Sequence, residues 1–156
     1  MRDASATARF LAAEREAIIS AATEALGRTA ARHYVAAGAG VRQERNEALL
    51  DHVIESLNDR DLQAVVAYAE RIAQERFESG YDLAEVQAAF NALEEAAWSR
   101  VFALLEPSQF AEAIGLISTV VGAAKDALAR RYVDLASNAR APTLDYGALF
   151  RGPQGP

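Results

Sequence analysis

The sequence contains no cysteine, two histidines and a single lysine, Lys125. The absence of cysteine excludes disulfides, thiolate catalysis, zinc knuckles and iron–sulfur ligation within this chain. No stretch reaches the roughly 18 consecutive apolar residues that a membrane-spanning helix needs, and the N-terminus lacks the apolar block of a secretory signal. We therefore expect a cytoplasmic protein that does not engage a membrane.

Positive charge is also scarce. The chain has 16 basic and 22 acidic residues, which gives a net charge of -6 at pH 7. Nonspecific binding to nucleic acid needs a positive surface, because the phosphate backbone supplies most of the affinity. The composition therefore predicts no nucleic-acid partner.

Apolar residues, with alanine dominant, make up 51% of the 156 residues, which is enough for one domain with a real core. Alanine favours helices, and the apolar positions recur at spacings of three and four. The pattern predicts an all-α fold of about six helices, with no strand. We place them at residues 5–26, 29–37, 42–57, 60–79, 82–105 and 107–137.

The clearest local signal lies between the fourth and fifth predicted helices. Gly80 suits the left-handed residue that commonly closes a helix. Asp82 and Glu85 then match a capping box, and Tyr81 is placed to pack on Val86 as a hydrophobic staple. We expect the two helices to form an antiparallel hairpin about this turn.

Two charged residues fall on the apolar sides of that hairpin. Arg76 continues the stripe of the fourth helix, and Glu94 lies at the edge of the stripe of the fifth, level with Tyr68 in an antiparallel register. Buried polar groups must be paired, so either Arg76 extends to solvent with Glu94 on the flank, or a polar relay holds two packing states. The candidate ligand or switch residues are Tyr68, Arg76, Glu85, Glu94 and Trp98.

The residue types needed for catalysis or metal binding do not occur in suitable patterns. A di-iron bundle needs Glu-x-x-His pairs, but Ala30 and Leu49 stand three residues before His33 and His52. No nucleophile elbow and no phosphate-binding loop is present. His52 could serve as a haem ligand or could be an ordinary helical histidine. We predict no enzyme, no catalytic residue, no metal and no cofactor.

The last predicted helix carries two apolar stripes. One forms a continuous seam from Phe110 to Leu135, and the second lies about 100° round the helix. An arc this wide means that the helix is sandwiched within its own domain or offers a face to another chain. The second interpretation predicts a homodimer with the interface candidates Leu116, Val120, Ala123 and Ala127.

Proline and glycine become frequent after residue 138. We therefore divide the chain into one helical domain over residues 1–138 and a tail or linker over residues 139–156. Three apolar residues of the tail, Tyr146, Leu149 and Phe150, could dock on the body or on a neighbour, or the tail could be a disordered end.

The run from Tyr68 to Glu85, with its arginine, glycine turn and capped leucine helix, resembles the N-terminal sensor domain of RsbT co-antagonist (RsbRD-type) stressosome proteins. The resemblance covers roughly residues 30–135. It implies a globin-like or bundle-like domain that binds no haem, dimerises and feeds a signal into an output domain. The phosphorylatable STAS module expected as that output is not in this sequence, so we expect a free-standing relative or a fragment of a longer regulator.

The function predicted from the sequence is a non-enzymatic sensory or regulatory domain in bacterial stress signalling. It would relay a signal through helix packing and dimerisation to a downstream regulatory protein or output domain. The alternative is a helical protein that binds a small molecule or a haem-like cofactor in a pocket near Tyr68, Trp98 and Phe102.

Overall fold

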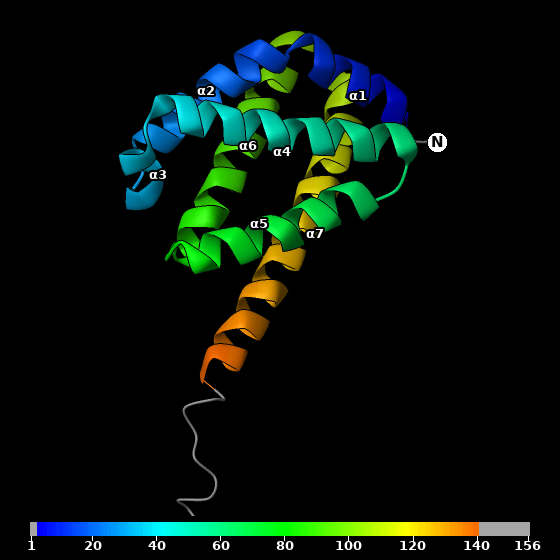
Figure 1. Ribbon diagram of the computed structural model, residues 1–156. Coiled ribbons are helices and arrows are strands. Elements are labelled where there is room, and N and C mark those ends of the chain that lie inside the picture. Colours follow the sequence, from blue (N-terminus) through cyan, green and yellow to red (C-terminus); the bar gives the residue numbers. More distant parts are fainter. Residues whose placement is uncertain (1–2, 141–156) are drawn as a thin grey trace, which may run out of the picture.

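The computed structural model describes residues 3–140, which form seven helices and no strand (Figure 1). The all-α class is therefore confirmed. The helices are α1 (Ala4–Ala13), α2 (Arg15–Gly27), α3 (Arg32–Ala37), α4 (Ala39–Asp59), α5 (Gln63–Glu78), α6 (Leu83–Leu104) and α7 (Pro107–Arg140).

The first predicted helix is divided into α1 and α2 by a break at Glu14, whose φ is -95° and ψ is 9°. The sequence has no glycine or proline there, so no local signal marks the break. Arg100 of α6 donates to the Glu14 carboxylate through Nε over 2.8 Å, which fixes the bend from another helix. The prediction of one continuous helix was wrong at Glu14, where a contact from a distant helix accompanies the break.

Helices α4 and α5 also differ from the predicted bounds. Gly38 has a φ of +91°, and α4 begins directly after it and continues to Asp59. Arg60 then adopts the left-handed conformation with a φ of +55°. At the start of α5, the Asp61 carboxylate accepts the Gln63 N–H over 2.9 Å.

The turn between α5 and α6 agrees with the prediction. Gly80 has a φ of +82°, and its N–H donates to the Phe77 carbonyl while the Tyr81 N–H donates to that of Arg76. This pair of bonds is the Schellman motif. The predicted capping box of Asp82 and Glu85 is present at the start of α6.

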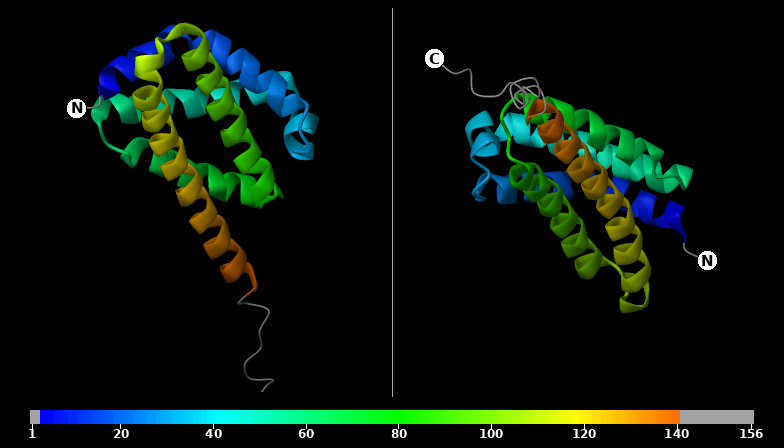
Figure 2. Two further views of the ribbon diagram at one scale, coloured as in Figure 1. Left: turned by 180° about the vertical axis from the view of Figure 1, so that it is seen from behind. Right: turned by 90° about the horizontal axis from the view of Figure 1, so that it is seen from below.

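The helices joined by this turn do not form the predicted hairpin. α5 crosses α7 and packs on it, whereas α6 packs on α2 and α7, so α5 and α6 diverge from their turn (Figures 1 and 2). The antiparallel neighbour of α6 is α7, which follows it after the short turn at Leu105 and Glu106. The predicted register that set Glu94 level with Tyr68 is therefore wrong.

Helix α7 packs on four of the other helices. It contacts α5, α6, α4 and α1, and its C-terminal part projects beyond the body (Figures 1 and 2). The predicted seam is confirmed at its centre, where Ile117, Val121, Ala124 and Leu128 are all at most 1% exposed. The core is completed by side chains from every other long helix, including Leu11, Ile18, Leu26, Leu50, Val53, Val65, Phe90 and Leu93.

We expect opposite effects from alanine at two glycines. Gly80→Ala places a side chain in the left-handed region and should lower the free energy of unfolding by about 1 kcal/mol. Gly122 lies inside α7 with open space where a Cβ would stand, so Gly122→Ala should raise it by about 1 kcal/mol. Urea denaturation followed by circular dichroism checks both. Equal effects of one sign would contradict the assigned conformations.

The predicted tail lies mostly outside the described residues, as do Tyr146, Leu149 and Phe150. Residues 139 and 140 continue α7, which is three residues longer than the predicted helix. Among residues 3–140, no helix combines the length and the apolar character required to cross a bilayer.

Candidate functional site

The buried polar residues mark the candidate site. Arg76, Glu85 and Glu94 are 8%, 6% and 8% exposed. The interpretation in which Arg76 extends to solvent and Glu94 lies on an open flank is therefore excluded. These three side chains belong to different groups, however, and have different partners.

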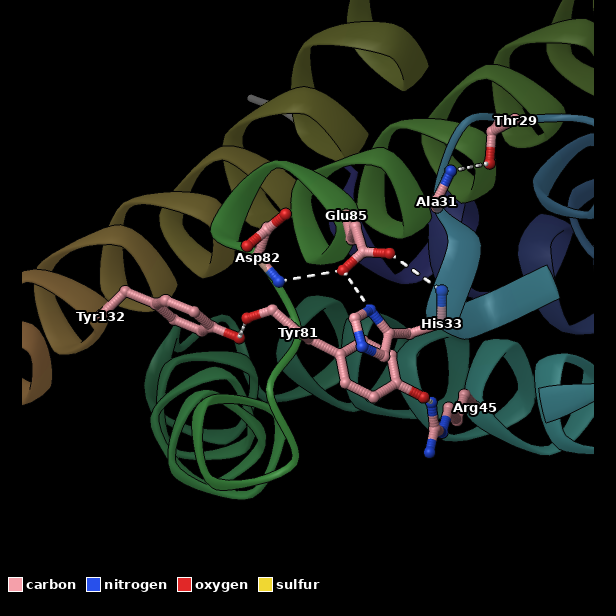
Figure 3. A network of polar contacts seen from close by, with 8 residues as sticks. All are labelled: Thr29, Ala31, His33, Arg45, Tyr81, Asp82, Glu85 and Tyr132. Atoms are coloured by element: carbon pink, nitrogen blue, oxygen red, sulfur yellow. Dashed lines mark hydrogen bonds and ion pairs between the residues drawn. The ribbon is translucent and has the colours of Figure 1, made fainter. Parts of the chain in front are cut away.

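Glu85 accepts three hydrogen bonds at the start of α6 (Figure 3). The His33 backbone N–H donates to Oε1 over 2.9 Å, and the Asp82 N–H donates to Oε2 over 2.9 Å. His33 Nδ1 lies 2.7 Å from Oε2. Burial acts to raise the pKa of Glu85, but the hydrogen bonds from His33 and Asp82 outweigh it and the pKa is lowered. The carboxylate is ionised and accepts only, so Nδ1 must carry the proton.

Tyr81 extends these contacts to two more helices (Figure 3). Its ring stacks on His33 at a centroid distance of 4.8 Å, and its hydroxyl accepts a 2.6 Å hydrogen bond from Arg45 Nη1 of α4. Its carbonyl accepts a 3.1 Å hydrogen bond from the buried Tyr132 hydroxyl of α7. We call His33, Arg45, Tyr81, Glu85 and Tyr132 the turn network. It joins α3, α4, α6 and α7 at one point.

Arg76 lies beside the turn network among tyrosines. Its guanidinium carbon is 5.9 Å from the centroid of the Tyr81 ring, and Tyr34 and Tyr68 are close enough to affect its charge. Its ion-pair partner is the neighbouring Glu75, with 3.3 Å between Nη1 and Oε2. Burial raises the pKa of Tyr68 to about 12, and the pKa of Tyr34 is also raised. Both phenols therefore remain neutral hydrogen-bond donors at physiological pH.

Glu94 belongs to a separate ion pair on another face of α6. Its Oε1 lies 3.7 Å from Lys125 Nζ of α7, and Lys125 also donates to Asn91 over 3.1 Å. Burial raises the pKa of Glu94, and Lys125 partly opposes that shift. Glu94 is nine residues from Glu85, about 14 Å along the helix. The predicted relay through both Arg76 and Glu94 is therefore not one connected network.

The predicted pocket near Tyr68, Trp98 and Phe102 is not formed by these residues. Phe102 is 57% exposed and stacks edge to face on Phe110, at the N-terminal end of α7. The helix that carries Tyr68 meets α7 around Ala123, about 20 Å further along α7. Trp98 is half-buried, and its buried Nε1 has no hydrogen-bond partner among the described residues.

His52, considered above as a haem ligand, is engaged within the protein. Its ring stacks on Tyr68 with 4.5 Å between the centroids, and its Nδ1 lies 3.4 Å from Glu55 Oε2 but forms no hydrogen bond within the described residues. Within residues 3–140, no three His, Asp or Glu side chains gather in a way that could hold a metal ion.

The predicted dimer residues lie largely inside the single chain. Val120 and Ala127 are 4% and 8% exposed, whereas Leu116 and Ala123 are half-buried. Ala123 and Ala127 line an open hollow of about 420 Å³ between α5 and α7. The wide apolar arc of α7 was interpreted either as packing within the domain or as a face for another chain. Most of the second stripe packs within the domain.

Sequence reasoning identified Glu85 through the capping box and missed its most distant partners. His33 and Glu85 are 52 residues apart, and Arg45 and Tyr81 are 36 apart. No spacing rule connects such pairs. The one available signal was Tyr81 in the turn, because a buried tyrosine hydroxyl needs a hydrogen-bond partner.

The family model of the RsbT co-antagonist protein rsbRD N-terminal domain matches residues 11–141. No curated protein and no solved structure matches the chain. The match confirms the resemblance carried by residues 68–85 and extends it over helices α2 to α7 and the end of α1. Because it covers most of the chain, the protein belongs to the family of the RsbT co-antagonist RsbRD N-terminal domain, a regulatory domain of stress signalling.

Proposed function

We propose that this domain carries a stress signal without catalysing a reaction, by coupling the packing of α3 and α4 to the position of α7. The turn network supports this proposal, because one turn connects these helices through Glu85, Tyr81 and Tyr132. The proposal places the domain in the cytoplasm, the usual location of the proteins of this family.

The projecting end of α7 is the part suited to pass the signal on. It follows Tyr132 directly and exposes Val133, which is 61% accessible. A change at the turn network would alter the hydrogen bond from Tyr132 and thereby the direction in which this end points (Figure 1). A downstream regulatory protein would bind the projecting end of α7, or an output domain would be attached to it.

Spin-label distances can test this coupling, since the chain has no cysteine of its own. Ser20 of α2 and Ser137 of α7 are exposed, so Ser20→Cys and Ser137→Cys give two labelling sites. We expect one narrow distance distribution for this labelled protein. Adding Glu85→Gln should broaden the distance distribution or produce a second one. The glutamine amide has only one acceptor oxygen, and its NH2 group would face an N–H donor of His33 or Asp82.

Glu95→Gln is the matched control, because Glu95 is an exposed residue of the same helix. It should leave the distance distribution unchanged. If Glu85→Gln also leaves it unchanged while weakening the domain, the turn network has a purely structural role and the proposed coupling is wrong.

We further propose that the domain acts as a homodimer. Burial of Val120 and Ala127 leaves Leu116 and Ala123 as the partly exposed members of the predicted interface. Closed two-fold pairs are the commonest assemblies of soluble chains. Light scattering at micromolar concentration is the test, and a strict monomer would contradict this part of the proposal.

A further inference from the structure

A groove of about 340 Å³ lies between α4 and α5, and Arg76 lines it. Its volume falls within the range of small-molecule sites, roughly 300–1,000 Å³. Arg45 lines it from α4, and Arg71 and Arg76 line it from α5. Ala48, Tyr68 and Ile72 supply apolar surface between these charges.

Part of the hydrogen-bonding capacity of Arg76 is unused. Arg76 is only 8% exposed, yet its buried Nε has no hydrogen-bond partner within the described part of the chain. Glu75 meets only Nη1, and the Glu75 side chain is 56% exposed. Nearby tyrosine rings favour the charge but do not accept a hydrogen bond from Nε. A buried guanidinium N–H without an acceptor costs free energy. An acceptor on a bound molecule would remove that cost.

The other two arginines, Arg45 and Arg71, are held by tyrosine rings and not by a carboxylate. The guanidinium carbon of Arg45 lies 5.2 Å from the ring centroids of both Tyr34 and Tyr81. That of Arg71 lies 5.4 Å from the Tyr68 centroid. Neither Arg45 nor Arg71 forms an ion pair within residues 3–140. Tyrosine rings thus fix their positions and leave their charge unneutralised, as a preformed anion site requires.

The groove is positive on a negative protein. Its three arginines exceed its two glutamates, Glu44 and Glu75, whereas the whole chain carries a net charge of -6. Tyr68 lines the groove as a neutral residue, because burial raises its pKa to about 12. A site of this kind favours an acceptor that bears negative charge.

We propose that the groove between α4 and α5 binds the carboxylate or phosphate of a small organic molecule, with Arg76 and Arg71 holding the oxyanion. The apolar part of the molecule lies against Ala48 and Ile72. Arg45 binds both this site and the Tyr81 hydroxyl, so the site adjoins the turn network. Binding at the groove does not require that α7 moves.

Nuclear magnetic resonance titrations at constant ionic strength test the site. Phenyl phosphate and benzoate are the probes, and comparing them distinguishes a phosphate site from a carboxylate site. We expect saturable shifts of the Arg76 Nε–H resonance and of amides in residues 41–48 and 68–76. Inorganic phosphate should bind more weakly for lack of an apolar part, and neutral benzyl alcohol should give no saturable shift.

Variants assign the binding to the groove. Arg76→Lys should weaken binding about tenfold, the effect of losing one charged hydrogen bond. Arg71→Gln should weaken it severalfold, and because Arg71 is exposed this variant tests the site even if Arg76→Lys fails to fold. Arg9→Gln removes the same charge from an exposed position of α1 and should change nothing. Shifts that do not saturate, or equal weakening by Arg9→Gln, would overturn the proposal.

Discussion

Replacing Glu85 with alanine should lower the free energy of unfolding by about 3 kcal/mol, because it removes a buried acceptor from three donors at once. The backbone N–H groups of His33 and Asp82 would lose their acceptor. Each such loss costs on the order of 1–3 kcal/mol. The cavity left by a side chain this deeply buried adds to the loss.

Urea denaturation followed by circular dichroism measures this change. Glu95→Ala is the matched control, since Glu95 is exposed on the same helix and its loss should change stability by less than about 0.5 kcal/mol. A decrease below 1 kcal/mol for Glu85→Ala would show that water or another side chain replaces the carboxylate, and that the turn network is not held by Glu85.

The same contacts predict how stability depends on pH. The pKa of Glu85 in the folded protein lies below its ordinary value of 4.5, so the ionised form favours folding. Its contribution is complete above the unfolded value and is lost as the pH falls through the lowered folded value. The stability difference between the unmodified protein and Glu85→Gln should therefore be constant from pH 7 to pH 5.5 and shrink below about pH 4.5.

Local signals predicted where helices end, but not how the helices cross. The Gly80 turn and the capping box agree with the structure because they involve hydrogen bonds within six residues. The angle between α5 and α6 depends instead on α7, which packs on both. A closing glycine is compatible with a hairpin and with diverging helices. The hairpin prediction was wrong because the turn does not determine the angle between the two helices.

The break at Glu14 shows a second limit of periodicity. The predicted helix over residues 5–26 places Ala17, Ile18 and Ala21 on its core side. Ile18 is buried as predicted, whereas Ala17 and Ala21 are exposed. Leu11 and Ile18 are buried on either side of the break and lie seven residues apart, so the apolar spacing continues across the break and does not mark it. Since Arg100 lies 86 residues away, no window along the chain reveals the contact that accompanies this break.

The sequence indicated which charged residues of the candidate site are buried, but not which residues they contact. Arg76 and Glu94 stood out because charged residues interrupted apolar stripes, and both are buried. Their partners were not predictable: Glu94 pairs with Lys125 of α7, and Arg76 lies among tyrosines from three different segments. The apolar periodicity of a helix indicates which side is buried, whereas ion pairing depends on how the helices pack against each other.

Val120→Glu should lower the free energy of unfolding by about 4 kcal/mol, because it buries a charge without a partner. Val120 is 4% exposed within α7, where α5 and α6 pack. A typical domain is stable by only 5–15 kcal/mol, so the variant would retain little margin. We expect the circular-dichroism helix signal to melt at a much lower temperature and the chain to aggregate.

Val133→Glu supplies the control, because it introduces the same substitution in the same helix at a residue that is 61% exposed. It should change stability by less than about 0.5 kcal/mol. Light scattering on both variants then separates the core from a dimer interface. If Val120→Glu kept its helix signal and converted a dimer into monomers, Val120 would lie between chains and its burial within one chain would be wrong. Loss of helix from Val120→Glu alone would assign this stripe of α7 to the core.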